Sequence, residues 1–288
     1  MLNPQDRRLA EAWESLKAQS ESGDALHPES NRLAFADPEF LLRRETRGIR
    51  FQLEMLKPDL AQHERGIENT VVVFGSARFV SEETAQTQLA QAQASGNAQA
   101  LAQAERALRN AAWYEQARAF ARIVSEQCSC LPAQEKLHIC TGGGPGIMEA
   151  ANRGAHDVGQ PSVALNIVLP HEQSANPFVT PELSFKFHYF ALRKMHFMMR
   201  AKALVAFPGG FGTLDELFEV MTLVQTRKSR PVPILLYGRD YWQRLINLQV
   251  LVDEGTISAD DLKLFTYVDT PQEAWQHICD FYRLPVDN

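Results

Sequence analysis

The chain has 288 residues, of which 45% are hydrophobic, and its formal net charge is −6. This size permits one large hydrophobic core with appendages, and the charge disfavours a nucleic-acid surface, which normally shows a concentrated basic footprint. No stretch approaches the roughly 18 apolar residues of a membrane span, and the first residues lack the apolar segment of a signal peptide. We therefore expect a cytoplasmic protein that binds neither membrane nor nucleic acid.

The four cysteines and eight histidines show no metal-binding spacing. The cysteines lack paired C-x-x-C motifs, so we expect reduced thiols rather than a zinc site. His188 and His196 are eight residues apart, unlike the i, i+4 pairs that bind a metal from one helix face. We expect no metal and no cofactor.

Residues 1–68 are predicted to form a polar, helix-rich N-terminal extension. One helix is expected from Phe40 to Leu56, closed by Lys57-Pro58, because the residue before a proline avoids helical backbone. Residues 69–288 are predicted to form a Rossmann-like domain with a helical insertion at 82–110. Alanine and glutamine dominate this insertion, which favours a helical hairpin with a thin apolar face.

The remainder alternates strand and helix patterns. Apolar runs predict strands near 71–75, 137–141, 162–168, 203–207, 232–237 and 265–268. Helical patterns occur near 113–128, 146–158, 190–201, 213–226, 240–253 and 271–282. This alternation predicts an α/β fold, a Rossmann-like doubly wound parallel sheet with helices on both faces. The segment Pro170–Lys186 has no clear period, and we expect it to arch over the ligand site with Glu172 and Asn176.

The first predicted strand ends in Gly75-Ser76-Ala77-Arg78. Its continuous apolarity suits a strand covered on both faces. Because open α/β sheets bind ligands at the carboxyl ends of their strands, Gly75, Ser76 and Arg78 are candidate ligand contacts. Taken alone, an arginine at a strand end is also a common surface residue.

The second predicted strand leads into a glycine-rich loop at 141–146, TGGGPG. Free N–H groups at the start of a helix and the helix dipole favour an anion, so Gly143 and Gly144 are candidate phosphate contacts. One such loop is equally compatible with a structural tight turn. The chain contains neither G-x-x-x-x-G-K-[ST] nor G-x-G-x-x-G, which disfavours a P-loop enzyme and a nicotinamide dehydrogenase.

The segment 207–219, FPGGFGTLDELFE, is the most informative part of the chain. Here an apolar run leads into a predicted amphipathic helix through a tight turn formed by Pro208, Gly209, Gly210 and Gly212. The glycines leave the backbone of this turn accessible to a ligand. Thr213 opens the predicted helix, and the carboxylates of Asp215 and Glu216 follow. This order suggests a phosphate beside a reacting centre that needs negative charge. Alternatively, Thr213 and Glu216 form a capping box, whose loss costs about 0.5–2 kcal/mol and which implies no chemistry.

These motifs together resemble the Lonely guy (LOG) family, whose older label is "possible lysine decarboxylase". The family's PGGxGTxxE motif is matched from Pro208 to Glu216, and its arginine–lysine pair appears as Arg193-Lys194. The segment 169–197 resembles the longer bacterial branch, and the whole resemblance covers about residues 70–282. It implies hydrolysis of the N-glycosidic bond of a nucleoside 5′-monophosphate, AMP or a cytokinin riboside monophosphate, by a homodimer or larger homo-oligomer.

The resemblance also implies roles for individual residues. Arg193 and Glu216 would be the catalytic pair. Since cleavage of a ribosyl bond builds positive charge on the sugar, a fixed carboxylate would stabilise that charge and activate water. The 5′-phosphate would lie on the amides of Gly209 to Thr213. The complete predicted substrate-binding set is Gly75, Ser76, Arg78, Gly143, Gly144, Glu172, Lys194, Pro208, Gly209, Gly210, Gly212, Thr213 and Asp215.

Other functions are also compatible with these motifs. A non-catalytic nucleotide-binding sensor or scaffold could use the same phosphate loops. A single-strand nucleic-acid binder is the least favoured, because the net charge is −6. A pyridoxal-phosphate decarboxylase is a poor interpretation, because Lys194 already belongs to the arginine–lysine pair.

Overall fold

The computed structural model describes residues 11, 14, 33–168 and 174–284. The chain divides into two compact units, Met1–Glu54 and Met55–Asn288. In the first unit, η2 (Ala34–Ala36) precedes α2 (Pro38–Leu42). The Asp37 side chain caps α2 by accepting a hydrogen bond from the Phe40 N–H at 3.1 Å. The predicted single helix from Phe40 to Leu56 is wrong, because this segment contains a break between α2 and α3 (Arg47–Glu64).

Pro58 does not end the helix as we predicted, but lies inside α3. A proline costs one backbone hydrogen bond in a helix interior. Within the second unit the helix is nevertheless held at this position and just after it. The Gln62 side chain donates to the Pro58 carbonyl at 3.0 Å, and the Asp59 carboxylate pairs with Arg200 at 2.5 Å.

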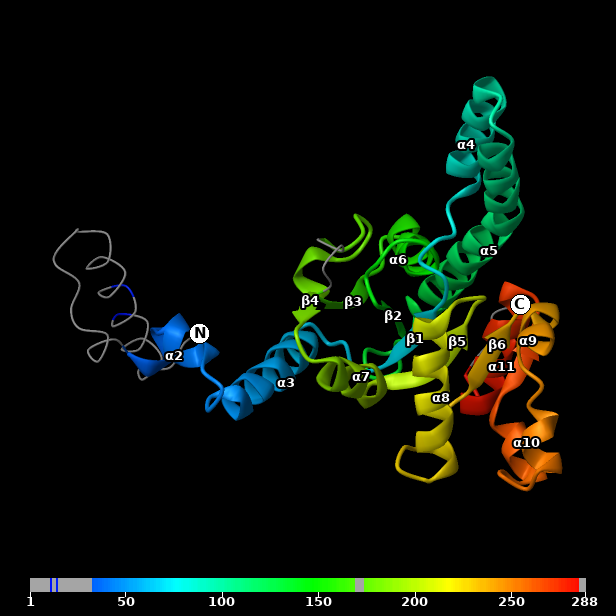
Figure 1. Ribbon diagram of the computed structural model, residues 1–288. Helices are drawn as coiled ribbons and strands as arrows, with labels where there is room; N and C mark the ends of the chain where they lie inside the picture. Colours follow the sequence, from blue (N-terminus) through cyan, green and yellow to red (C-terminus); the bar gives the residue numbers. More distant parts are fainter. Residues whose placement is uncertain (1–10, 12–13, 15–32, 169–173, 285–288) are drawn as a thin grey trace. The chain divides into compact units, whose positions relative to one another are not determined.

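The second unit is built on a seven-stranded sheet in the order β4-β3-β2-β1-β5-β6-β7 (Figure 1). Every neighbouring pair of strands is parallel. The strands are β1 (Thr70–Phe74), β2 (His138–Thr141), β3 (Ser162–Ile167), β4 (Ser184–Phe187), β5 (Ala201–Ala206), β6 (Ile234–Tyr237) and β7 (Thr266–Val268). The strand order reverses direction at β1, and in such sheets the crevice at this reversal is where ligands bind.

Strand β4 is a correction to the prediction, which described Pro170–Lys186 as a segment without regular structure. The short 3₁₀-helix η3 (Pro181–Leu183) leads directly into β4. Only one face of β4 is fully buried, through Phe185 and Phe187. An edge strand of four residues with such a partial pattern gives little signal in the sequence.

Helices cover both faces of the sheet, as predicted (Figure 1). On one face, α5 (Ala98–Cys128), α6 (Ile147–Asp157) and α11 (Pro271–Tyr282) pack against alternate strand residues such as Val71 and Val73. On the other, α7 (Phe190–Met199), α8 (Phe211–Gln225) and α9 (Arg239–Leu245) contribute to a hydrophobic cluster that includes Val72 and Phe74. The elements α10 (Gln249–Asp253) and η4 (Ala259–Leu264) connect α9 to β7.

The predicted helical insertion is a hairpin of α4 (Glu82–Ser95) and the first part of α5 (Figure 1). Gly96 ends α4 with a φ of 64°, and the Asn97 side chain caps α5 by accepting from two backbone N–H groups. The separate helix that we predicted at 113–128 is the continuation of α5. Alanine-rich sequence offers no break between the hairpin and the core helix, because alanine is the strongest helix former.

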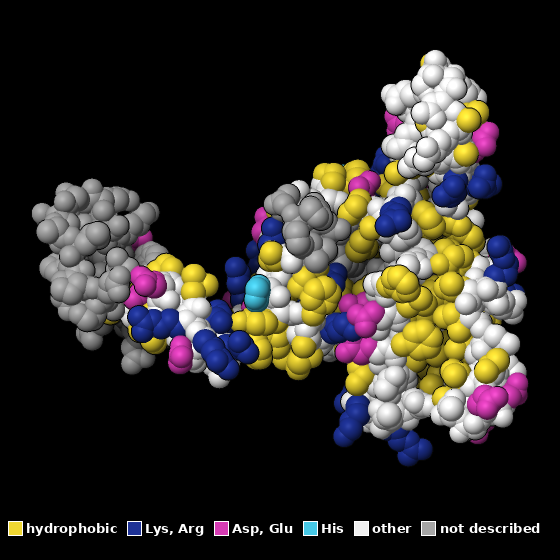
Figure 2. All heavy atoms as spheres, viewed as in Figure 1, with side chains coloured by type: hydrophobic (Ala, Val, Ile, Leu, Met, Phe, Trp, Pro, Cys, Tyr) yellow, Lys and Arg dark blue, Asp and Glu magenta, His cyan; other side chains and the backbone are white. Residues whose placement is uncertain are grey.

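Figure 2 shows hydrophobic side chains gathered on the surface over α8 and its neighbours. Phe211 is 92% exposed and Phe218 is 37% exposed. Within the described residues, no helix combines the length and the hydrophobicity that a membrane span requires.

Candidate functional site

A cavity of about 770 Å³ lies at the carboxyl ends of the central strands. Its walls come from the segments that follow β1, β2 and β5, together with side chains from β3, α5, α7 and α9. This is the edge of the sheet at which ligands are expected in an open parallel α/β fold. Its volume lies in the range of small-molecule sites, about 300–1,000 Å³.

Most of the predicted site residues line this cavity. They are Gly75, Ser76, Arg78, Gly144, Arg193, Pro208, Gly209, Gly210, Gly212, Thr213, Asp215 and Glu216. Gly143 and Lys194 are outside the lining, and Glu172 falls outside the described residues. The segments that follow β1, β2 and β5 are far apart in the sequence but together line this cavity.

The three loops contact one another through their backbones. The Ser76 N–H donates to the Pro208 carbonyl at 2.9 Å, and the Ile147 N–H donates to the Ser76 carbonyl at 3.0 Å. A Cβ on Gly146, whose φ is +74°, would lie 2.2 Å from that same Ser76 carbonyl oxygen. A Cβ on Gly75 would lie 2.6 Å from the Ile147 side chain. Glycine is thus needed for the loops to approach this closely.

The start of α8 excludes the capping-box alternative. The helix begins at Phe211, and Gly210 occupies the N-cap position without a side-chain cap. Thr213 is therefore already inside the first turn, where it cannot act as the N-cap residue of this helix. Both Thr213 and Glu216 are buried, each with 6% exposure. Helix capping therefore does not explain the glutamate at position 216, which lines the cavity.

Burial governs the electrostatics of Glu216. Loss of solvent raises the pKa of this carboxyl group from 4.5 to about 7, against the lowering effect of the nearby cations of Arg193 and Lys194. The Glu216 Oε1 atom lies 3.9 Å from Arg193 Nη1, beyond the range of a direct hydrogen bond. The carboxyl group therefore changes its charge near neutral pH, which is typical of acid–base residues at functional sites.

Arg193 is fixed in place by contacts other than Glu216. Its Nε donates to the Leu165 carbonyl at 2.7 Å, and its guanidinium carbon lies 5.1 Å from the centre of the Phe197 ring. A Cβ on Gly142 would lie 2.5 Å from Arg193 Nη2. The glycine at position 142 therefore leaves the room that the guanidinium occupies.

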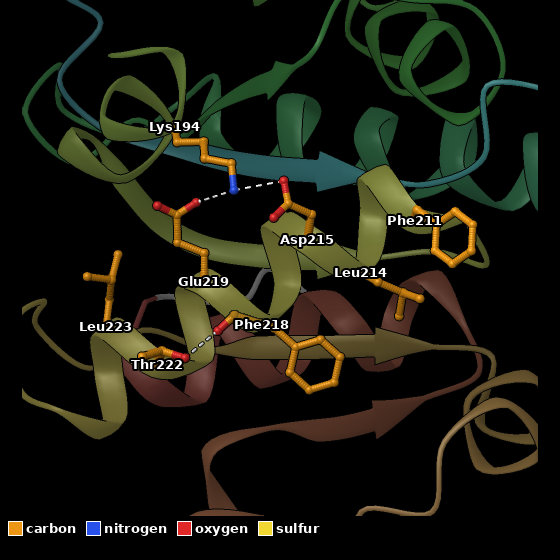
Figure 3. Close-up of a pocket in the computed structure, with 8 residues that line it drawn as sticks. All are labelled: Lys194, Phe211, Leu214, Asp215, Phe218, Glu219, Thr222 and Leu223. Atoms are coloured by element: carbon orange, nitrogen blue, oxygen red, sulfur yellow. Dashed lines mark hydrogen bonds and ion pairs between the residues drawn. The ribbon is translucent and has the colours of Figure 1, made fainter. Parts of the chain in front are cut away.

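Lys194 faces a different surface from Arg193. Its Nζ lies 2.8 Å from Asp215 Oδ2 and 2.8 Å from Glu219 Oε2, so that it links α7 to α8 (Figure 3). Figure 3 shows these ion pairs beside the exposed rings of Phe211 and Phe218. Consecutive helical residues point about 100° apart, which explains why the two cations of one motif serve different surfaces.

Several cavity residues could not be identified from the sequence. They include Asn110 and Trp113 of α5, Met148 of α6, Asn166 of β3, Phe190 of α7 and Tyr241 of α9. Tyr241 also donates its hydroxyl proton to the Gly209 carbonyl at 2.6 Å. None of these residues belongs to a glycine motif, and no local pattern distinguishes them from core or surface residues.

The raised pKa of Glu216 predicts a pH-dependent effect of Glu216→Gln on stability. Between about pH 4.5 and pH 7 the unfolded chain loses this proton while the folded chain keeps it, so the free energy of unfolding falls as pH rises. The loss reaches about 3 kcal/mol above pH 7. Glutamine removes this penalty. In urea unfolding, the free energy of unfolding of Glu216→Gln minus that of the wild type should be larger at about pH 8 than at about pH 5. An identical difference at both pH values would contradict the raised pKa.

Comparison with known proteins finds one matching family and several similar sequences. The family model described as "Possible lysine decarboxylase" matches residues 148–278. The cytokinin riboside 5′-monophosphate phosphoribohydrolase LOG of Oryza sativa subsp. japonica is 30% identical over 135 residues, which cover 46% of this chain and 54% of that protein. A cytokinin riboside 5′-monophosphate phosphoribohydrolase of Arabidopsis thaliana is 28% identical over 135 residues, which cover 46% of this chain and 61% of that protein. The predicted resemblance to the Lonely guy family is confirmed.

The matches span only part of these relatives, a little over half of their length. Among solved structures, the molybdenum cofactor binding protein of the phototrophic bacterium Rippkaea orientalis is 13% identical. That match covers 75% of this chain and 98% of the other, with a TM-score of 0.46.

Proposed function

We propose that this relative of the Lonely guy family hydrolyses the N-glycosidic bond of a nucleoside 5′-monophosphate to free base and ribose 5-phosphate. The observation that carries this proposal is the placement of Glu216. Its carboxyl group is buried, lies 3.9 Å from a fixed guanidinium, and lines the cavity at the start of α8. A protein that only held a nucleotide would gain nothing from a carboxylate that is costly to bury.

The 5′-phosphate is assigned to the start of α8. The first N–H groups of a helix have no intrahelical acceptor, and the helix dipole favours negative charge there. Gly210 and Gly212 line the cavity without a side chain that would block access to these N–H groups. The Thr213 hydroxyl is a further donor in the same lining. An anion bound here would hold the ribose a short distance from Glu216, five residues along the helix from Phe211.

Glu216 would act on the sugar in its ionised form. As the bond to the base breaks, positive charge builds on the ribose, and a carboxylate held in a water-poor cavity stabilises that charge strongly. The same carboxylate can take a proton from the attacking water. Arg193 would keep Glu216 partly ionised near neutral pH and contribute positive charge toward the anionic nucleotide. Lys194, which is bound to Asp215 and Glu219, would fix α7 against α8.

The rest of the cavity suits a purine base, and we propose AMP as a substrate with a cytokinin riboside monophosphate as the alternative. Trp113 and Phe190 offer aromatic surface, while Asn110 and Asn166 offer amide groups. Aromatic rings and a small number of polar groups are the usual means by which a pocket binds and orients a flat ligand. The amides favour a base with an unmodified exocyclic amine, and the apolar surface would accommodate a prenyl group.

Base release tests this proposal directly. Purified protein incubated with AMP or isopentenyladenosine monophosphate, without added metal, should yield free base and ribose 5-phosphate by chromatography. Glu216→Gln should lower kcat by about 10²-fold or more while nucleotide binding persists. For the wild type, kcat/KM should rise with pH as Glu216 ionises, reach half of its plateau at about pH 7 and level off above it.

Glu219→Gln is the matched control, because Glu219 lies on the same helix and outside the cavity lining. It should retain most of the activity, because the amide oxygen of glutamine can still accept from Lys194 and the ion pair of Lys194 with Asp215 still joins α7 to α8. Nucleotide binding by the wild type without release of any base would contradict the enzymatic proposal and favour a sensor. A large loss of kcat in Asp215→Asn, with Glu216→Gln still active, would transfer the catalytic role to Asp215.

We also propose that the protein is a homodimer, as expected from the family resemblance. Phe211, which also lines the cavity, and Phe218 carry exposed rings on α8 (Figure 3). Burial of such rings between two copies is favourable by roughly 25 cal/mol per Å² of apolar surface. Light scattering should give a mass near twice 32.4 kDa, and Phe218→Glu should shift it toward the monomer. A monomeric wild type at micromolar concentration would refute this assembly.

A further inference from the structure

A chain of buried polar side chains lies behind the glycine loop that follows β2. Thr141, Asn152, Ser162 and Asn176 are 0%, 0%, 1% and 9% exposed. The Asn152 Oδ1 atom accepts from the Thr141 hydroxyl at 2.7 Å and from Asn176 Nδ2 at 3.0 Å. The Asn152 side-chain amide in turn donates to Ser162 Oγ at 3.0 Å. Such a network is maintained only when its polar atoms have partners, since an unpaired buried polar group is costly.

Asn176 connects this network to the loop backbone. Its Nδ2 lies 3.2 Å from the Gly143 carbonyl oxygen and 3.1 Å from that of Gly144. Its backbone N–H also donates to the Gly143 carbonyl at 2.8 Å. Asn176 is absent from the cavity lining, so it lies behind the loop and not over the ligand site as the sequence led us to expect.

These contacts orient one peptide unit. In a planar trans peptide the C=O and the following N–H point in opposite directions. Since Asn176 holds the Gly143 oxygen from behind, the Gly144 N–H is directed to the other side of the loop, where Gly144 lines the cavity. Gly143 itself has a φ of +73°, a conformation that a glycine readily leaves when nothing holds it.

We propose that Asn176 is a positioning residue that presents the Gly144 N–H to an oxygen of the nucleotide. This inference rests on the proposed function for the identity of the ligand. Asn176 contacts no substrate and acts only by fixing the orientation of the Gly143–Gly144 peptide unit. When the Asn176 side chain is removed, the Gly143 carbonyl keeps only its hydrogen bond from the backbone N–H of residue 176. The Gly144 carbonyl loses its contact with the side-chain amide.

The test compares Asn176→Ala with Asn69→Ala. Asn69 is a close control, because it is also 9% exposed and its Nδ2 also donates to two backbone carbonyls, those of Gln134 and Lys136. It precedes β1, however, and lies at the opposite end of the sheet from the cavity. Both variants lose side-chain contacts to two backbone carbonyls, but Asn176→Ala also loses the contacts with Asn152 and with the Phe178 N–H and should show the larger loss in melting temperature.

Calorimetry measures the proposed effect with ribose 5-phosphate and, in proteins that also carry Glu216→Gln so that AMP is not hydrolysed, with AMP. Asn176→Ala should weaken the affinity for both by about ten-fold, as expected for one lost hydrogen bond to a charged group, and Asn69→Ala should leave it nearly unchanged. In turnover, KM should rise with little change in kcat. Asn176→Ser, which keeps a hydroxyl donor, should restore part of the affinity and replaces the alanine variant if that one does not fold.

Equal affinities for the two alanine variants would overturn the positioning role, as would a loss confined to kcat. Because affinity is measured without turnover, the two proposals fail separately. If the wild type binds AMP but releases no base, the hydrolase proposal is refuted. The affinities of the Asn176 and Asn69 variants still test the positioning role in that case. A wild type that binds neither AMP nor ribose 5-phosphate refutes both proposals.

Discussion

The burial of Glu216 beside Arg193, at the carboxyl edge of a parallel sheet, is the constraint on which the rest of the site depends. A carboxyl group with 6% exposure is unfavourable in its charged form, and this raises its pKa to about 7. A cation 3.9 Å away offsets part of that cost. The result is a group whose charge can change near neutral pH, in a position where a bound ribose could reach it.

This arrangement requires surroundings that are almost free of side chains. The guanidinium of Arg193 occupies space that any side chain at Gly142 would fill. The loops after β1, β2 and β5 join through backbone hydrogen bonds, such as the one between Ser76 and Pro208. Glycine permits this contact and at the same time exposes N–H groups to a ligand. The glycine motifs therefore shape the space around Glu216 and supply the N–H groups to which we assign the phosphate.

The sequence predicts the parts of this structure that depend on local patterns. Continuous apolar runs identify six of the strands, because a strand covered on both faces has no polar alternation. The glycine motifs identify much of the cavity wall, because parallel strands bring their carboxyl ends to one edge. The separation of Arg193 from Lys194 is not predicted, since it depends on how α7 is rotated against α8.

Features that depend on long-range packing are not predicted either. Trp113 and Tyr241 reach the cavity from helices whose local sequence resembles that of ordinary amphipathic helices. The role proposed for Asn176 rests on contacts with residues 24 and 33 positions away. The position of Pro58 inside α3 likewise depends on Gln62 and Arg200, which hold the helix around it. In each case the decisive partner lies on another turn or another element.

A crystal structure of Glu216→Gln with AMP bound is the most direct test of the central claim. The account predicts that the 5′-phosphate lies on the N–H groups at the start of α8, with ribose C1′ about 3–4 Å from the side chain at position 216. A phosphate bound elsewhere, for example beside Lys194 in the groove of Figure 3, with the ribose far from position 216, would contradict it.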